Sequence, residues 1–206
     1  MPPKFIYFDL GNVILHFSHE RMCRQMAEVA RVSYEAMHAA LFDLKIKEQA
    51  EAGVLNPTEY YEALCRAVGT RPDRTALERA CNDIFQLNAP IVPLIVALET
   101  TGHRIGILSN ICENHWRWVS DNRFGVLPGA FDTFALSFEL GAAKPSAQIF
   151  RRAAELAGVA PEEVLFTDDM PGHVAAAMAA GFDAVPFTTP AALAAAMRKR
   201  GIRPNY

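Results

Sequence analysis

The residues best suited to chemistry in this sequence stand directly after short apolar segments. Asp9 ends the apolar run 5–8 and is followed at once by glycine and asparagine, an order typical of a buried strand that stops at a sharp turn. Other polar residues stand at similar points, and they are Ser109, Asn110, Lys144, Asp168 and Asp169. Ligand sites in open α/β sheets lie outside the carboxyl ends of the strands, so we expect these side chains to converge.

Their charges suit a divalent cation together with a phosphate group. The carboxylates of Asp9, Asp168 and Asp169 would repel one another if they were crowded together without a counter-ion. Oxygen ligands of this kind suit Mg²⁺, which commonly binds one or two carboxylates together with substrate phosphate. Lys144 adds a positive charge, so the carboxylates are neutralised and a phosphate dianion can enter. The Ser109 hydroxyl and nearby backbone N–H groups can then bind the phosphate oxygens.

In this arrangement Asp9 stands in line for attack on phosphorus. A carboxylate nucleophile of this kind forms an aspartyl-phosphate intermediate, which water hydrolyses in a second step. Positioning and charge neutralisation would supply most of the catalysis. The residues therefore predict phosphoryl transfer to Asp9, with Mg²⁺ as the cofactor and a small phosphorylated metabolite as the substrate.

The elements that must position these residues alternate between strands and helices. Strands are predicted over 5–8, 104–108, 131–137, 164–167 and 184–187, and helices over 91–100, 113–120, 146–157, 172–180 and 190–200. Pro145 is expected in the first turn of the helix 146–157. The alternation predicts the α/β class, with a Rossmann-like parallel sheet covered by helices on both faces.

One segment, 19–88, interrupts this alternation, because its pattern predicts roughly four helices and no strand. Ser18 is expected to cap the first of these helices. The segment follows the first strand directly and so should lie beside Asp9. We therefore expect a small all-helical cap domain over 19–88, and a catalytic core composed of 1–18 and 89–206.

Composition places few further demands on function. The chain has 206 residues, of which 51% are hydrophobic and 21% charged, as is typical of a soluble globular protein. The net charge of -3 argues against nucleic acid or an anionic membrane as a partner. No apolar run is long enough to span a membrane, and no secretory signal is expected before the first strand. Four cysteines without CxxC spacing predict reduced thiols and a cytoplasmic location, while oligomeric state stays open.

Four motifs occur along the chain in a familiar order. They read Phe-Asp-Leu-Gly-Asn-Val at 8–13, Ile-Leu-Ser-Asn at 107–110, Ala-Lys-Pro at 143–145 and Phe-Thr-Asp-Asp at 166–169. In this order the chain resembles the haloacid dehalogenase-like (HAD) hydrolases over essentially its whole length. The first motif is similar to that of the Asp-Leu-Gly-Asn-Val phosphatase group, which includes α-glucose-1-phosphate phosphatases, and to the phosphatase domain of soluble epoxide hydrolase.

The resemblance implies a role for each motif residue. Asp9 would be the nucleophile and a metal ligand, and the backbone carbonyl of Gly11 would be a second ligand. Lys144 would bridge the phosphate and Asp9, and the cap would determine substrate specificity. The remaining motif residues divide into phosphate-binding Ser109 and Asn110, and metal-binding Asp169 and Asp168, the latter directly or through water.

Gly11 departs from the pattern that the resemblance implies. Most phosphatases of the family carry a second aspartate at this position, which protonates the leaving oxygen and then activates water. General acid–base help is typically worth about 10²–10⁴-fold in rate. Glycine cannot transfer a proton, so activity is weak, another group serves, or the leaving group needs little help. An anomeric sugar oxygen leaves more easily than an ordinary alkoxide, which favours a sugar 1-phosphate.

Two alternative functions stay open. A 2-haloacid dehalogenase uses its carboxylate to attack carbon and needs no metal, but the pair Asp168 and Asp169 favours the phosphatase. A catalytically weak binding or regulatory protein is motivated by Gly11 alone.

Several neighbouring residues have both a structural and a functional interpretation. His173 stands where relatives often carry asparagine, His115, Trp116 and Trp118 line the substrate mouth or pack, and Cys112 is expected to be a small buried residue.

Overall fold

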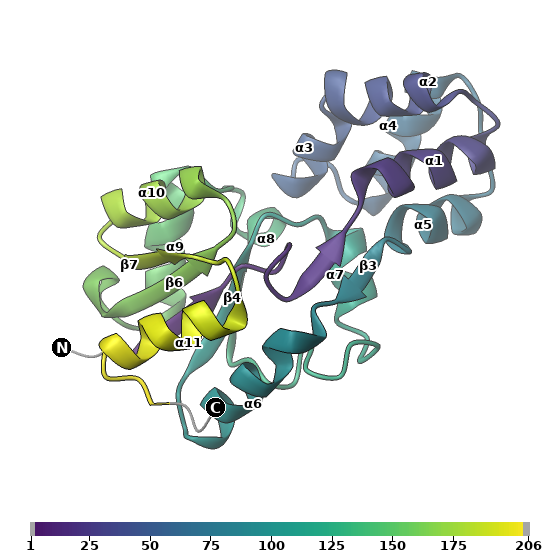
Figure 1. Ribbon diagram of the computed structural model, residues 1–206. Coiled ribbons are helices and arrows are strands. Elements are labelled where there is room, and N and C mark those ends of the chain that lie inside the picture. The colour runs from purple at the N-terminus through teal and green to yellow at the C-terminus, as the bar shows by residue number, and fades with distance from the viewer. Residues whose placement is uncertain (1–2, 204–206) are drawn as a thin grey trace.

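A five-stranded parallel sheet forms the centre of the protein. The computed structural model describes residues 3–203, and Figure 1 shows a sheet-containing lobe with a helical lobe beside it. The strand order is β5-β4-β1-β6-β7, so β1 is the central strand. The strands are β1 (Phe5–Phe8), β4 (Ile105–Ser109), β5 (Thr133–Leu136), β6 (Val164–Asp168) and β7 (Asp183–Pro186).

Strand β1 shows why the sheet is buried on both faces. Its four residues are all apolar or aromatic and all buried. Ile6 and Phe8 belong to one hydrophobic cluster, and Phe5 and Tyr7 belong to another on the opposite face. Successive side chains of a strand point to opposite faces, so a continuous apolar run is what a covered parallel strand requires.

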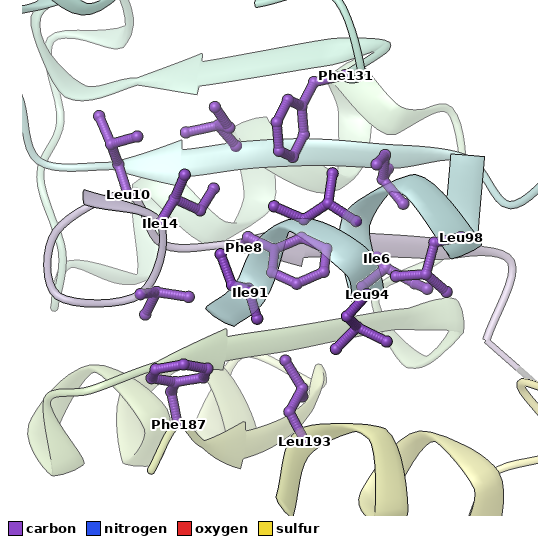
Figure 2. Close-up of a cluster of buried hydrophobic side chains, with 14 of the residues drawn as sticks. Ile6, Phe8, Leu10, Ile14, Ile91, Leu94, Leu98, Phe131, Phe187 and Leu193 are labelled. Carbon is purple, nitrogen blue, oxygen red and sulfur yellow. The ribbon is translucent and has the colours of Figure 1, made fainter. Parts of the chain in front are cut away.

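Helices cover both faces of this sheet. The first cluster includes apolar residues of α6 (Val92–Thr100) and α11 (Pro190–Lys199), as Figure 2 shows around Phe8. The second cluster includes residues of α9 (Ala147–Ala157) and α10 (Pro171–Ala179). The predicted α/β class and Rossmann-like sheet are therefore confirmed.

A separate helical lobe lies between β1 and α6 along the chain. It comprises α1 (His19–Ala30), α2 (Tyr34–His38), a π-helical turn η1 (Ala39–Asp43), α3 (Ile46–Glu51), α4 (Pro57–Val68) and α5 (Arg74–Asn82). These helices enclose a hydrophobic cluster of their own. The Ser18 side chain accepts from the backbone N–H of Arg21, so it caps α1 as expected. We refer to residues 19–84 as the cap.

The expectation that no strand lies within 19–88 is wrong. The segment β3 (Phe85–Leu87) pairs in antiparallel fashion with β2 (Leu15–Phe17), and the two form a ribbon between the lobes. Each strand has only three residues, so neither carries a readable alternation, and the partners are far apart in sequence. The lobe also contains five short α-helices and the π-helical turn, where roughly four helices were expected.

Two smaller differences concern the core elements. Helix α9 begins after Ser146, whose side chain caps it, so Pro145 precedes the helix and is joined to Lys144 by a cis peptide bond. Strand β5 ends at Leu136, and a short helix α8 (Ser137–Leu140) follows directly. The remaining elements are α7 (Glu113–Val119) and the 3-10 turns η2 (Ala89–Ile91) and η3 (Pro161–Glu163). Within residues 3–203, no helix has the length and apolarity to cross a membrane.

Candidate active site

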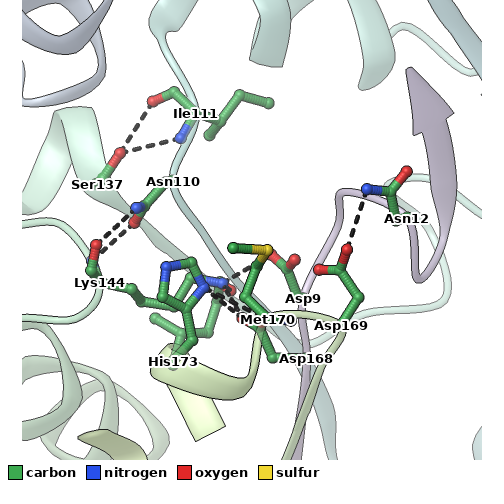
Figure 3. A network of polar contacts seen from close by, with 11 residues as sticks. Asp9, Asn12, Asn110, Ile111, Ser137, Lys144, Asp168, Asp169, Met170 and His173 are labelled. Atoms are coloured by element: carbon green, nitrogen blue, oxygen red, sulfur yellow. Dashed lines mark hydrogen bonds and ion pairs between the residues drawn. The ribbon is translucent and has the colours of Figure 1, made fainter. Parts of the chain in front are cut away.

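The carboxyl ends of β1, β4 and β6 meet at one edge of the sheet and bring an ion-pair network together. The Lys144 ammonium lies 2.8 Å from Asp9 Oδ1 and 2.6 Å from Asp168 Oδ2. It also donates to the Leu108 carbonyl at 3.0 Å. Lys144 and Asp168 are almost completely buried, so the lysine is fixed between two carboxylates, as Figure 3 shows.

Burial and Lys144 have opposite effects on the pKa values of Asp9 and Asp168. Burial raises the pKa of Asp9 to about 6, although the neighbouring Lys144 opposes that rise. Burial acts in the same sense on Asp168, but hydrogen bonds from His173 and the charge of Lys144 outweigh it, and the pKa of Asp168 lies below its ordinary value. One lysine therefore does not offset the effect of burial on Asp9, and further positive charge nearby would favour the ionised carboxylate.

The third carboxylate, Asp169, completes a group that fits a metal ion. One oxygen each from Asp9, Asp168 and Asp169 lie within 4.8 Å of one another. Asp169 lines the adjacent cavity and its Oδ2 accepts from Asn12 Nδ2 at 3.0 Å. Hard oxygen donors around one point suit Mg²⁺, and a divalent ion would supply the charge that Asp9 lacks. The donor set therefore fits the expected metal.

Asn12 is a site residue that the sequence analysis missed. Its φ of 54° lies in the left-handed region, which few residues other than glycine adopt readily. Asparagine tolerates this conformation better than most residues, and the turn aims its amide at Asp169. The Asp-Leu-Gly-Asn order signalled a turn, but it did not show which carboxylate the asparagine would meet.

The Asn110 side chain is hydrogen-bonded to the loop that follows α8, and its phosphate-binding role stays a prediction. Its side-chain amide is occupied by the Lys144 backbone, donating to the carbonyl at 2.9 Å and accepting from the N–H at 2.8 Å. It therefore holds the loop that carries Lys144. Ser109, at the end of β4, is buried and lines the cavity, as do Asn110 and Lys144.

His173 belongs to the site. Its Nδ1 lies 3.1 Å from both carboxylate oxygens of Asp168, and the residue lines the cavity. Met170 donates its backbone N–H to Asp168 Oδ1 at 2.8 Å from the same helix start. Asp168 thus receives hydrogen bonds from the start of α10 as well as from Lys144. Of the adjacent pair Asp168 and Asp169, only Asp169 lines the cavity.

A serine at the start of α8 joins the site to the cap, and sequence analysis missed it as well. The Ser137 hydroxyl donates to the Glu51 carbonyl at 2.6 Å and accepts from the Ile111 N–H at 3.0 Å. Ile111 follows directly after the motif residues of β4. Ser137 is completely buried, so this contact fixes the end of α3 against the core.

Gly11 lies under an aromatic ring. A Cβ added at Gly11 would come within 2.8 Å of Phe17 Cε1, closer than real Cβ atoms approach carbon. Its φ lies outside the left-handed region, so the ring and not the backbone conformation restricts this position.

The other candidate residues separate into two kinds. His115 is buried, lines the cavity, and lies 3.5 Å from Cys81 Sγ through its Nε2. The cavity lining does not include Trp116, which packs on Phe134, or Trp118, whose ring is covered by Arg123. Cys112 is buried as expected, and burial raises the pKa of its thiol to about 11.

A cavity of about 250 Å³ lies between the sheet edge and the cap. Asp9, Ser109, Lys144 and Asp169 line its core side, and cap residues line the opposite side. Pockets for drug-sized ligands usually measure about 300–1,000 Å³. The size of this cavity therefore favours a compact metabolite.

Comparison with known proteins identifies the family. A family model described as haloacid dehalogenase-like hydrolase matches residues 3–181. The chain belongs to the haloacid dehalogenase-like hydrolases. The resemblance inferred from the four motifs is thus confirmed at the level of the family, while the Asp-Leu-Gly-Asn-Val subgroup stays a prediction.

Individual relatives cover most of the chain. D-ribitol-5-phosphate phosphatase of Bacteroides thetaiotaomicron is 23% identical over 185 residues, which cover 87% of this chain and 89% of that protein. A HAD family enzyme of the same organism, solved in complex with magnesium and inorganic phosphate, is 24% identical with a TM-score of 0.81, covering 91% of this chain and 95% of that one. A predicted HAD-like family hydrolase of Porphyromonas gingivalis is 26% identical with a TM-score of 0.81, covering 97% and 98% of the two chains.

Proposed function

We propose that this HAD hydrolase is a Mg²⁺-dependent phosphomonoesterase that acts on a small phosphorylated metabolite through an aspartyl-phosphate at Asp9. The observation that carries the proposal is the charge balance at the sheet edge. Three carboxylates cluster at this edge, one buried lysine pairs with two of them, and the cluster borders a metabolite-sized cavity. The phosphatase named among the relatives and the magnesium complex of another relative support the same chemistry and the same cofactor.

Asp9 is the nucleophile in this proposal. Its carboxylate lies at the carboxyl end of the central strand and lines the cavity. Burial raises its pKa, and positive charge nearby favours the ionised carboxylate that attack requires. When bound, Mg²⁺ would supply that charge and also neutralise the phosphate. The free carboxylate then attacks phosphorus as the bond to the leaving oxygen breaks, and the alcohol departs. Water hydrolyses the aspartyl-phosphate, which releases phosphate and restores Asp9.

The other residues position this chemistry. Asp9 and Asp169, together with the Gly11 carbonyl, are the groups proposed to hold the metal, and Asp168 contributes directly or through water. Lys144 keeps Asp9 oriented, and Asn110 keeps Lys144 in place through its backbone. Ser109 and backbone N–H groups after β4 are proposed to bind the phosphate oxygens.

Gly11 sets a condition on the substrate. The side chain that would protonate the leaving oxygen is missing from the first motif, and the Phe17 ring fills the space beside it. We infer that the substrate has a leaving group of low basicity, such as an anomeric sugar oxygen, or that a cap residue assists its departure. The cap is therefore proposed to determine both the specificity and part of the rate.

The test is phosphate release from p-nitrophenyl phosphate and from hexose 1-, hexose 6- and pentitol phosphates. A pentitol phosphate belongs in this panel because one relative is a D-ribitol-5-phosphate phosphatase. We expect turnover with Mg²⁺ and none with EDTA. Asp9→Asn should abolish turnover at unchanged fold, measured by circular dichroism, while the exposed control Asp121→Asn should retain it.

Two other outcomes would replace the proposal. Halide release from 2-haloacids in EDTA, without phosphate release, would identify a dehalogenase. Binding of Mg²⁺ and inorganic phosphate in calorimetry, without turnover of any substrate, would identify a binding or regulatory protein. Turnover retained by Asp9→Asn would refute the covalent mechanism while leaving the phosphatase activity in place. A cytoplasmic location stays a prediction from the cysteine pattern.

A further inference from the structure

The cap side of the cavity carries an ion pair that the proposed chemistry does not use. Lys47 and Glu51 lie one turn apart on α3, and the lysine ammonium donates to Glu51 Oε1. Both residues line the cavity that contains Asp9. Their side chains are only 14% and 20% exposed, whereas the next pair on the same segment, Lys45 and Glu48, is 67% and 69% exposed.

Stability does not explain why this pair is buried. Removing two charges from water costs free energy, and replacing a buried ion pair by apolar residues is often neutral or stabilising. The surrounding wall is apolar and aromatic, with Phe17, Ile84 and Phe85. An ion pair in such a wall is costly for folding, so its place in the cavity wall points to a binding role.

Helix α3 is held rigidly against the core, so the pair has a defined place relative to Asp9. The Glu51 carbonyl accepts the Ser137 hydroxyl at 2.6 Å. Two residues later, a Cβ on Gly53 would lie 2.1 Å from the Phe138 carbonyl oxygen, so the two backbones touch. Gly53 also has a φ of 71°, which suits glycine. These two contacts join the end of α3 to the start of α8.

The pair has unused hydrogen-bonding capacity. An ammonium group has three donors and a carboxylate about four acceptor sites, and among residues 3–203 the Lys47 ammonium donates only to Glu51. His19 lines the same wall, and its pKa is lowered to about 4 by burial first and then by the charges of Lys47 and His115. At neutral pH this imidazole is uncharged and offers one donor and one acceptor.

We propose that Lys47 and Glu51 form a subsite for the leaving group and bind hydroxyls of a neutral, polyhydroxylated metabolite, so that sugar or polyol phosphates are the substrates. This deepens the phosphatase proposal and rests on it. A hydroxyl can accept from Lys47 while its neighbour donates to Glu51, which suits the adjacent hydroxyls of a sugar or polyol. The pair carries no net charge, so it offers no preference for a second anionic or cationic group, and the cavity has the size of a compact metabolite.

The experiment compares two substrates in five proteins. Wild type, Lys47→Met, Lys47→Arg, Glu51→Gln and the exposed control Lys45→Met are assayed with the best sugar or polyol phosphate and with p-nitrophenyl phosphate, whose leaving group has no further hydroxyl. The measured quantity is the ratio of kcat/KM for the two substrates. This ratio does not depend on the fraction of folded enzyme, so a partly unstable variant still gives an answer.

We expect Lys47→Met and Glu51→Gln to lower the ratio by about 10–100-fold, the effect of losing a hydrogen bond to a charged group. Lys45→Met should leave the ratio unchanged. Lys47→Arg should restore part of the loss, since it keeps the charge and the donors. Equal losses on both substrates, or no loss on either, would overturn the subsite. No phosphate release by the wild-type enzyme from any substrate would instead refute the phosphatase proposal itself.

Discussion

Replacement of Gly11 by alanine tests whether the Phe17 ring is what excludes a side chain from the first motif. The added methyl group would lie 2.8 Å from Phe17 Cε1. The ring cannot move freely, since its centroid lies 4.8 Å from that of His19 and 6.3 Å from that of Phe85. Gly11→Ala must therefore displace a ring that is packed between two others.

The size of the effect follows from two opposing contributions. Overpacking of this kind typically costs about 1–3 kcal/mol. Replacing glycine by alanine also restricts the unfolded chain, which stabilises the protein by about 0.4–1 kcal/mol where the backbone tolerates it. The backbone at Gly11 does tolerate it. We therefore expect Gly11→Ala to lose about 0.5–2 kcal/mol of unfolding free energy, as the difference of these two contributions.

Replacing Phe17 by leucine should remove the overpacking cost of Gly11→Ala and leave the stabilisation that comes from restricting the unfolded chain. In the Phe17→Leu background, Gly11→Ala should be neutral or stabilising by up to about 1 kcal/mol. The coupling between the two substitutions would then be about 1–3 kcal/mol, which is well within the range measured for residues in contact.

The assay is urea unfolding at neutral pH of the wild type, both single variants and the double variant, all in EDTA. Equal m-values across the four proteins would show that the free energies are comparable. A coupling below about 0.5 kcal/mol would refute the reasoning, because it would mean that the ring is not the obstacle. Gly11→Asp should behave as Gly11→Ala does toward Phe17, since both introduce the same Cβ.

Three further predictions concern other residues. Asn12→Ala and Asn12→Gly should both raise the Mg²⁺ concentration for half-maximal activity by about 10-fold, because both lose the hydrogen bond to Asp169. Only the alanine variant should also lose about 1 kcal/mol of stability, since the φ at position 12 is 54° and glycine adopts it freely. Equal stability of the two variants would contradict the second expectation. Lys144→Met should cost about 3–5 kcal/mol in urea unfolding, because it leaves Asp168 buried without its cation; a loss under about 1 kcal/mol would show that the pair is not needed for folding. Folding lowers the pKa of His19 from 6.5 to about 4. Between these pH values the unfolded chain binds more protons than the folded one, so the free energy of unfolding falls as the pH falls. His19→Gln should reduce that fall by about 1–2 kcal/mol after allowing for the partly exposed ring. Asp9, whose pKa is raised, makes stability rise as the pH falls, but it does so equally in wild type and His19→Gln and cancels when the two are compared. Identical dependence of stability on pH in the two proteins would refute the prediction for His19.

Much of the site could be predicted because the end of a buried strand can be read from a few residues, and parallel strands bring such ends together. Asp9 and Asp168 each end a short buried run, and parallel strands place such ends at one edge. Topology alone then brings them together, with no knowledge of side-chain packing. The pattern of apolar segments likewise predicted the alternation of the five core strands with helices along the chain.

Contacts between segments distant in sequence could not be predicted in this way. Asn12 meets Asp169 across 157 positions, and Ser137 meets Glu51 across 86. Each contact depends on where a turn aims one side chain, which periodicity does not encode. The hydrogen bonds of the Asn110 amide to the Lys144 backbone could not be predicted for the same reason, while the phosphate-binding role of Asn110 stays a prediction.

The β2–β3 ribbon has a consequence for how such proteins diversify. Phe17 and Phe85 are paired residues of that ribbon, and opposed residues of antiparallel strands lie about 4.5–5.5 Å apart at Cα. The chain therefore leaves and re-enters the core at almost one point. Exchanging the intervening segment 18–84 for one of another length would leave this closure in place, and the cost of ordering a longer excursion grows only slowly with its length. The whole cap could thus be exchanged for another segment while the sheet edge that carries Asp9 stays unchanged.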